Sequence, residues 1–345
     1  MRNKFNIFII SYLSIIFLSC ETIIDDIPLS RFPDLQEKLV MTSFLCPQDT
    51  MIYVSLGKSI PLFGTVKIDT TKVLIYTGDS ANFLRVNNYV SDAIVSISDG
   101  IKGSILKFNP KHKFYEISRR DFRIESGKTY TIKAKSGNLE VEASTKIPSQ
   151  RVRINNLQIR PFMQITSTFF EKDTNIGYQL QFDWLDIAGE PNYYKVFGEM
   201  TYQQLEPVIK NVENKEEVSI VEKTKYAYFR WPNEQSSAVR SYYTDQNADG
   251  NQFKIGAVNF FENRSIFRTK SGTYKSETVP DSDKIIRVQL SNISKEFYDY
   301  QKSLSEHNRT DDNPFAEPIQ VYTNVKNGFG CVAGYNRTET VVGTK

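Results

Sequence analysis

The chain contains few of the residues on which catalytic and metal-binding motifs depend. Its 345 residues include only two histidines, His112 and His307, and three cysteines. No Gly-x-Ser-x-Gly sequence accompanies either histidine, so a serine hydrolase triad is not indicated. No two histidines or cysteines have the spacing of zinc ligands, and no glycine-rich phosphate loop is present. The sequence therefore predicts neither catalytic residues nor a cofactor.

A strong excess of charge of one sign is also lacking. The chain has 43 basic and 40 acidic residues. Without its first 19 residues it would lose two basic residues and no acidic one, which leaves 41 against 40. Because such a balance gives little attraction to nucleic acid, we expect no nucleic-acid partner.

The N-terminus carries a continuous hydrophobic run. Arg2 and Lys4 precede the mostly apolar segment 5–18, which is typical of a secretory signal peptide and short of the ~20 residues of a membrane span. A Leu-Ser-Cys sequence ending at Cys20 resembles a lipobox, although Phe17 stands where leucine is usual. We expect cleavage before Cys20 and acylation of its thiol, with palmitate as one acyl group. The alternative is an ordinary signal peptide with an unrelated cysteine, or an uncut N-terminal anchor.

Acidic residues follow this cysteine, at Glu21, Asp25 and Asp26. They resemble the export signal of surface-exposed lipoproteins in Bacteroidetes-type bacteria. We therefore expect a lipid-anchored protein of the outer membrane that faces outside. A merely solvated tether would also be polar, and that alternative stays open.

Most of the remaining chain alternates apolar and polar residues with a period of two, which is typical of half-buried antiparallel strands. About seven such segments before Lys146 suggest an immunoglobulin-like or transthyretin-like sandwich. We predict a mostly β protein with two β-sandwich domains. The expected parts are a signal peptide (1–19), a lipidated tether (20–37), an N-terminal β-sandwich domain (38–148) and a C-terminal β-rich domain (149–345).

Three segments depart from this pattern. Ile293, Phe297, Tyr300 and Leu304 recur every three to four residues, which predicts a single helix at about 294–307 capped by Ser294. Residues 59–91 and 204–224 do not read as strands of the sandwiches. Long connections of this kind are either functional or insertions with a strand or two of their own.

One segment has the spacing of calcium ligands. Asp245, Asn247 and Asp249 occupy positions 1, 3 and 5 of a calcium loop, with Gly250 at position 6. The bidentate glutamate of position 12 is missing, because Gly256 stands there. The segment is a weak metal candidate, and we expect a turn rich in Asp and Asn without a tightly held metal.

Other side chains suggest packing and ligand contact. Cys46 and Cys331 lie far apart in the sequence, which favours two separately buried thiols over a disulfide. Adjacent tyrosines such as Tyr193-Tyr194 and Tyr242-Tyr243 place one ring outward if the other points inward. Exposed tyrosines on rigid strands suit contact with a glycan or a peptide.

Towards the C-terminus, Asn327-Gly328 is a tight-turn signal. It predicts a hairpin of strands around 319–322 and 329–332. We expect this segment to be structural, with Phe315, Val321 and Phe329 buried, rather than to place Glu317, Asn324 and Lys326 in a cleft.

Several stretches together resemble the lipoprotein family catalogued as domain of unknown function 4249. The stretches that carry the resemblance are Leu18-Ser19-Cys20-Glu21, Leu39–Gln48, Val90–Gly100, Gly127-Lys128-Thr129-Tyr130, Ala143–Pro148, Glu296–Tyr300, Asn313–Pro318 and Tyr322–Gly330. They extend over most of the mature chain and include no catalytic motif. The resemblance implies a two-domain β lipoprotein that is often encoded near TonB-dependent outer-membrane receptors.

The resemblance thus implies a non-enzymatic binding accessory to a TonB-dependent nutrient transporter. Its partners would be the membrane, through the lipid, a TonB-dependent outer-membrane receptor and an extracellular glycan or peptide. Two alternatives from other classes remain: a carboxylate-dependent, glycosidase-like surface hydrolase, and a structural or adhesion module. A carboxylate pair about 5–9 Å apart would favour the hydrolase, and an aromatic cleft would favour binding.

Overall fold

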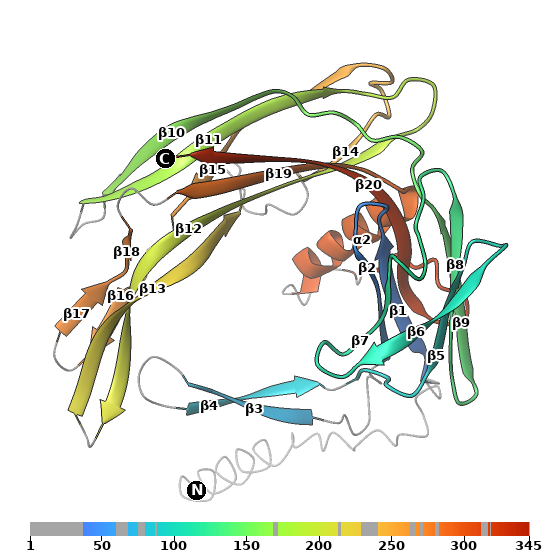
Figure 1. Cartoon of the computed structure of the whole chain (residues 1–345), viewed down its shortest axis with the longest axis horizontal. Coiled ribbons are helices and arrows are strands. Elements are labelled where there is room, and N and C mark those ends of the chain that lie inside the picture. Colours follow the sequence, from blue (N-terminus) through green and yellow to red (C-terminus); the bar gives the residue numbers. More distant parts are fainter. Residues whose placement is uncertain are drawn as a thin grey trace, which may run out of the picture. The chain divides into compact units, whose positions relative to one another are not determined.

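A computed structural model shows a protein built mostly of β-strands with one α-helix near the C-terminal end of the described chain (Figure 1). The structure describes residues 37–59, 68–74, 80–86, 88–167, 172–212, 215–228, 241–262, 266–269, 272–279, 283–311, 317 and 319–344. The mostly β class and the single late helix are therefore confirmed.

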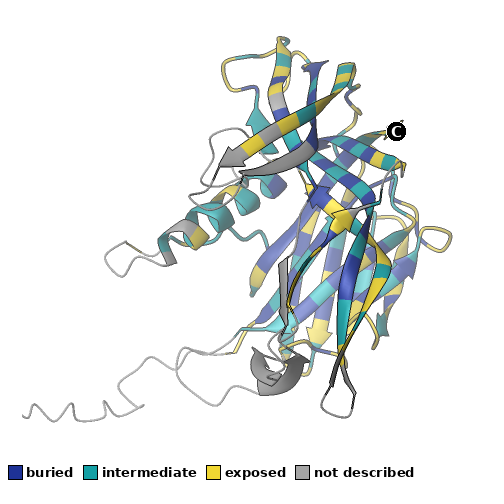
Figure 2. Ribbon diagram, turned by 90° about the vertical axis from the view of Figure 1, so that its left-hand side faces the viewer, coloured by how far each residue is buried: buried dark blue, intermediate teal, exposed yellow. Residues whose placement is uncertain are grey.

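The first part of the chain forms short antiparallel strands. They are β1 (Leu39–Leu45), β2 (Met51–Lys58), β3 (Ile68–Leu74), β4 (Ser80–Val86), β5 (Ile94–Ser98), β6 (Gly103–Asn109), β7 (Phe114–Ser118), β8 (Thr129–Ser136) and β9 (Leu139–Lys146). Buried residues alternate with more exposed ones along β1, β8 and β9, as the period of two predicts (Figure 2). Gly100 and Gly137 have φ of 87° and 57°, so the chain reversals at these positions need the freedom of glycine.

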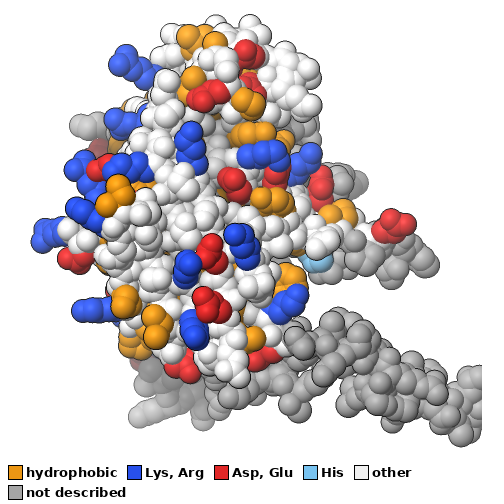
Figure 3. Space-filling view, turned by 90° about the vertical axis from the view of Figure 1, so that its right-hand side faces the viewer, with side chains coloured by type: hydrophobic (Ala, Val, Ile, Leu, Met, Phe, Trp, Pro, Cys, Tyr) orange, Lys and Arg blue, Asp and Glu red, His pale blue; other side chains and the backbone are white. Residues whose placement is uncertain are grey.

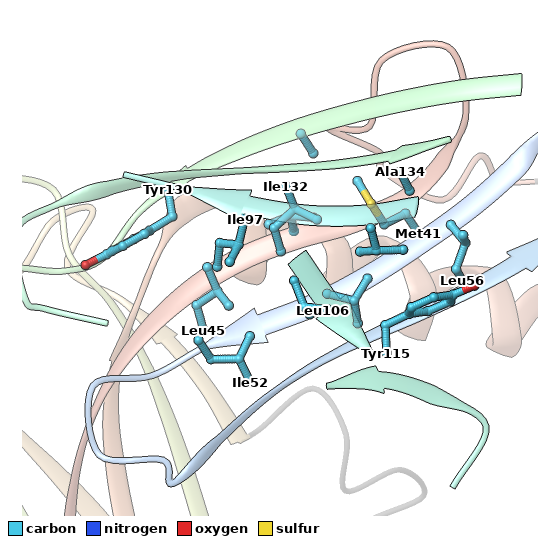
Figure 4. Close-up of a cluster of buried hydrophobic side chains, with 14 of the residues drawn as sticks. Met41, Leu45, Ile52, Leu56, Ile97, Leu106, Tyr115, Tyr130, Ile132 and Ala134 are labelled. Carbon is cyan, nitrogen blue, oxygen red and sulfur yellow. The ribbon is translucent and has the colours of Figure 1, made fainter. Parts of the chain in front are cut away.

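Apolar side chains from these strands meet in the first hydrophobic core. Figure 4 shows Met41 and Leu45 of β1 pointing toward side chains of β2, β5, β6, β7 and β8. Tyr115 and Tyr130 are buried there, and each hydroxyl accepts a backbone N–H at 2.8 Å, from Ala93 and Glu125 respectively. Burial of these apolar groups is the main stabilising contribution of this part.

The second part has longer strands. They are β10 (Asn155–Ser167), β11 (Lys172–Leu185), β12 (Tyr193–Val212), β13 (Lys215–Tyr228), β14 (Tyr242–Thr244), β15 (Gln252–Phe261), β16 (Ile266–Thr269), β17 (Gly272–Lys275), β18 (Glu277–Thr278), β19 (Lys284–Ile293) and β20 (Phe329–Thr344). Strands β10, β11 and β15 form one sheet, while β12 and β19 belong to another. Apolar side chains from β11, β12, β15 and β19 form most of a second hydrophobic core.

Trp184 lies in this second core and is fully buried. Its ring stacks on Phe253 with centroids 5.2 Å apart and meets Tyr194 and Tyr243 edge-on at 5.7 Å and 5.3 Å. The clustered aromatics therefore form the core, with Tyr194 pointing in and its neighbour Tyr193 pointing elsewhere.

The segment 204–224 is a hairpin, so the expectation that it does not form strands is wrong. Strands β12 and β13 pair continuously from Glu199↔Tyr228 to Val212↔Lys215. The charges that obscured the strand pattern compensate each other, because buried Glu206 contacts Lys223 at 3.0 Å and Lys225 at 2.5 Å. Burial would raise the pKa of Glu206, but these two lysines outweigh it and lower the pKa.

The long connection 59–91 also contains strands. Within it β3 and β4 pair as a hairpin separate from the main sheet. This agrees with the alternative of an insertion with strands of its own.

Strand β20 joins the two parts. Its first residues run parallel to β1, with Val40↔Phe329 through Leu45↔Gly334, and its later residues pair antiparallel with β19. Hydrogen bonds thereby connect strands of both parts into one thirteen-stranded sheet. The two-domain division at 148 and the sandwich type stay predictions.

The C-terminal hairpin is a wrong prediction. Residues 319–325 form no strand, and the partners of Phe329–Thr344 are β1 and β19. The turn itself is present, since Asn327 has φ of 61°. It directs the chain alongside β1, to which β20 pairs in parallel, instead of back along its own preceding segment.

The single described helix, α2 (Lys295–Asp311), ends four residues later than predicted. Ser294 caps it as expected, because its Oγ accepts the backbone N–H of Phe297 at 3.4 Å. Phe297 stacks on Phe44 of β1 with ring centroids 4.5 Å apart. The helix is thus held against the strands that join the two parts.

The surface carries charges of both signs. Figure 3 shows lysine and arginine side chains interspersed with acidic and hydrophobic ones on one face. Glu142, for example, contacts Lys133 at 2.7 Å and Lys326 at 3.7 Å. Mixing of this kind agrees with the near balance of charge in the sequence.

Candidate functional site

A cavity of about 1020 Å³ lies where the loop between β11 and β12 meets the loop between β14 and β15 and the first turns of α2. We call it the aspartate cavity. Its lining includes all three residues of the weak metal candidate, Asp245, Asn247 and Asp249. Cys20, the predicted lipidation site, lies outside the described residues.

Backbone N–H groups hold the aspartates of the two loops. Gly189 donates to Asp249 Oδ1 and Asn192 donates to Asp245 Oδ2, each at 2.8 Å. Gly250, with φ of 69°, turns the chain as expected. These bonds fix the two loops to each other, because each crosses from one loop to the other.

Asp186 is a member of this group that the sequence reasoning missed. Carboxylate oxygens of Asp186, Asp245 and Asp249 all lie within 4.8 Å of one another. Asp186 accepts bonds from Tyr194 Oη at 2.5 Å and from the Gly250 N–H at 2.8 Å. Burial, followed by the bond to Asp186, raises the pKa of Tyr194, so its hydroxyl remains a donor.

No local signal could have found Asp186. It precedes Asp245 by 59 residues and directly follows β11, so only strand pairing brings the two together. These three carboxylates are the described groups that could hold a cation, with the amide oxygen of Asn247 exposed on the same lining.

Helix α2 supplies the opposite wall. Lys295 pairs with Asp299 one turn later, and this hydrogen bond raises the pKa of Lys295. Tyr193 and Tyr298 place their rings 5.0 Å apart on the lining. The cavity thus combines an aromatic pair with carboxylates and ammonium groups, which suits hydrogen bonding and ring contact with a polar ligand.

We expect calcium to have little effect on the stability of this site. The aspartates already accept N–H bonds, as a turn requires. A ligand whose Kd exceeds its concentration raises the free energy of unfolding by less than ~0.4 kcal/mol. Thermal melting in millimolar calcium and in chelator should therefore agree within about 2 °C. A rise of many degrees that Asp249→Ala removes would show instead that the three aspartates hold the ion.

The two histidines lie apart from this cavity in the described structure. His112 is exposed and contacts Glu116 at 3.8 Å, whereas His307 Nδ1 lies 2.8 Å from the carbonyl of Ile319. Cys46 and Cys331 are both free and buried, as predicted. Burial raises the pKa of Cys331 to about 12, which favours the neutral thiol over the nucleophilic thiolate.

The polar residues of the C-terminal segment do not converge on a cleft. The side-chain amide of Asn324 donates to the carbonyl of Val332 at 2.7 Å and accepts the N–H of Val332 at 3.0 Å. These bonds to the backbone fit the structural interpretation. Glu317 is exposed, and Phe315 lies outside the described residues. The expected burial of Phe329 is wrong, because its ring is 42% exposed beneath the ammonium of Lys38.

Comparison with known proteins adds one match. The family described as Domain of unknown function (DUF4249) matches residues 27–341. The chain belongs to this family. No curated protein and no solved structure matches it. In the part of the DUF4249 chain that the structure describes, no helix is long and apolar enough to cross a membrane.

Proposed function

We propose that this DUF4249 protein is a surface-exposed outer-membrane lipoprotein that binds a nutrient and assists a TonB-dependent transporter. The lipid on Cys20 would hold it at the membrane, and the ligand would be a glycan or a peptide. The observation that carries the binding role is the aspartate cavity, with its Tyr193–Tyr298 pair and polar lining.

The architecture supports binding at this place. The two loops are cross-linked by hydrogen bonds, and α2 is fixed by its cap and by Phe297. A cavity that is formed before the ligand arrives loses little entropy on binding. Rigid walls also favour recognition of one shape over others.

Binding is tested with a glycan and peptide array probed with the chain from residue 21. Tyr298→Ala should weaken binding to any positive compound about tenfold or more, since an aromatic contact commonly contributes over ~1 kcal/mol. Tyr53→Ala, which removes a 45% exposed tyrosine on β2, is the matched control. Equal binding by the Tyr298→Ala variant would contradict a ligand in this cavity.

The same array distinguishes binding from hydrolysis. Release of shorter products from a bound glycan would favour the carboxylate-dependent hydrolase, whose acids would be among those lining the cavity. The transporter partner is tested by cross-linking cells that produce the tagged full chain, followed by purification from the membrane. Recovery of the tagged chain without any cross-linked TonB-dependent receptor would contradict the accessory role.

A further inference from the structure

A lysine lies on a sheet face where an apolar residue is usual. Lys195 is the third residue of β12, paired with Tyr242 of β14 and Ser291 of β19. Its neighbours Tyr194 and Val196 point into the second core, so Lys195 points to the opposite face of the sheet. There its Nζ lies 5.4 Å from the ring centre of Phe297 of α2 and 5.8 Å from that of Tyr242.

This half-buried ammonium has no ionic partner within the described chain. Burial lowers the pKa of Lys195, with no acidic group to offset the effect. On α2, Asp299 is already paired with Lys295. Contact with two rings compensates only part of the lost hydration of an ammonium.

The amine faces a cavity of about 280 Å³ between the sheet and α2, distinct from the aspartate cavity. Helix residues 301, 304, 305 and 308 follow the spacing of one helix face. The lining that matters here consists of Lys195, Tyr242, Gln301, Leu304, Ser305 and Asn308. Among the described residues that line this cavity, none is acidic.

We propose that this cavity is a second binding site, which takes a small ligand bearing a single carboxylate, such as a uronic acid. The carboxylate would pair with the Lys195 ammonium, and the amides of Gln301 and Asn308 with the hydroxyl of Ser305 would bond the rest of the ligand. The ring of Tyr242 offers an apolar face to a sugar ring or an aromatic acid.

Charge and size select this class of ligand. One lysine supplies one positive charge, which matches a monoanion, whereas phosphate sites usually add further cations or a row of backbone N–H groups. The volume of about 280 Å³ lies just below the ~300–1,000 Å³ typical of small-molecule sites. A single sugar acid or aromatic acid is therefore a better fit than an oligomer.

The inference is independent of the nutrient-binding role, because it concerns another cavity. Saturation-transfer NMR on the chain from residue 21 would compare glucuronate, benzoate, glucose and glucose 6-phosphate. We expect glucuronate, benzoate or both to bind with a Kd of about 1 mM or tighter, and glucose not to bind. Glucuronate alone would indicate a sugar acid, and benzoate alone an aromatic acid.

Two variants assign the binding to this amine. Lys195→Met keeps the apolar stem and removes the charge, so it should weaken carboxylate binding at least about tenfold. Lys210→Met, which alters an exposed lysine on the same strand, should leave binding unchanged. Thermal melting checks folding, and the Lys195→Met variant should melt no lower than the parent because a desolvated charge is lost.

Three outcomes would overturn the inference. They are absence of carboxylate binding at 10 mM ligand (about tenfold above the expected Kd), equal or tighter binding of glucose or glucose 6-phosphate, and retained carboxylate binding in a folded Lys195→Met variant. The array result for the Tyr298→Ala variant bears on the aspartate cavity alone. The two proposals can therefore fail separately.

Discussion

Replacing Gly330 with alanine is expected to lower the free energy of unfolding by about 3–5 kcal/mol. A Cβ at this position would lie 2.2 Å from the carbonyl oxygen of Met41 and 2.8 Å from its carbon. Both atoms belong to the backbone of β1, so relief requires the strands themselves to move apart. Overpacking costs ~1–3 kcal/mol or more, and φ of 107° adds roughly 1–3 kcal/mol for a residue with a side chain.

The position of Gly330 makes this loss consequential for the whole fold. It pairs with Met41 in the parallel contact of β20 with β1, and Val332 two residues later belongs to the first core. The later part of the same strand pairs with β19. A displaced β20 would therefore weaken the connection between the two parts of the chain.

Urea denaturation followed by circular dichroism measures the effect. Gly343→Ala on the same strand is the matched control, since a Cβ there meets nothing within 4 Å. It should change stability by less than about 1 kcal/mol. A Gly330→Ala protein as stable as this control would show that β20 does not approach β1 as closely as described.

Local patterns were sufficient to predict much of the fold. The strand alternation of β1, β2, β5 and β8 and the helical spacing from Ile293 depend on neighbouring residues, and both were found. The cap at Ser294 and the glycine turns are equally local. These features follow from the periods of side chains along a strand or a helix.

Non-local pairing accounts for what the sequence did not predict. The turn at Asn327 was identified, but its pattern cannot say that the following strand adds to β1, almost 290 residues earlier. The strands of 204–224 were missed because a buried Glu206 breaks the apolar alternation, and its two lysines come from the opposite strand. Both errors arise from contacts between segments that are distant in sequence or lie on different strands.

The residues of the candidate site also divide into those that a local motif predicted and those that only the fold brings together. Asp245, Asn247 and Asp249 were visible as one spaced motif, whereas Asp186 and Tyr298 join them only through the fold. Lys195 had no signal at all, because a lysine between two core-facing residues, Tyr194 and Val196, resembles any solvated strand position. Its burial depends on α2, which is 100 residues later.

Replacing Cys20 with alanine is expected to remove the protein from the washed membrane fraction. Each buried CH₂ of an acyl chain contributes about 0.8 kcal/mol, so two or more chains on one thiol hold a protein stably, while a single chain gives marginal binding. The variant has no thiol at residue 20 to accept them. Cells producing the full chain would be fractionated, and the membranes washed with carbonate.

Mass spectrometry identifies the attachment directly. The tryptic peptide Cys20–Arg31 of the parent should begin at the cysteine and carry acyl groups, because cleavage is expected after Ser19. Cys46→Ala is the control, since it removes a buried free thiol elsewhere and should leave the protein in the pellet. A Cys20→Ala chain that is cut after residue 19 and still remains in the carbonate-washed pellet would contradict the lipid anchor. In that case attachment would depend on contacts made by the folded chain, and the proposed role beside a membrane transporter would need a protein partner to hold it there.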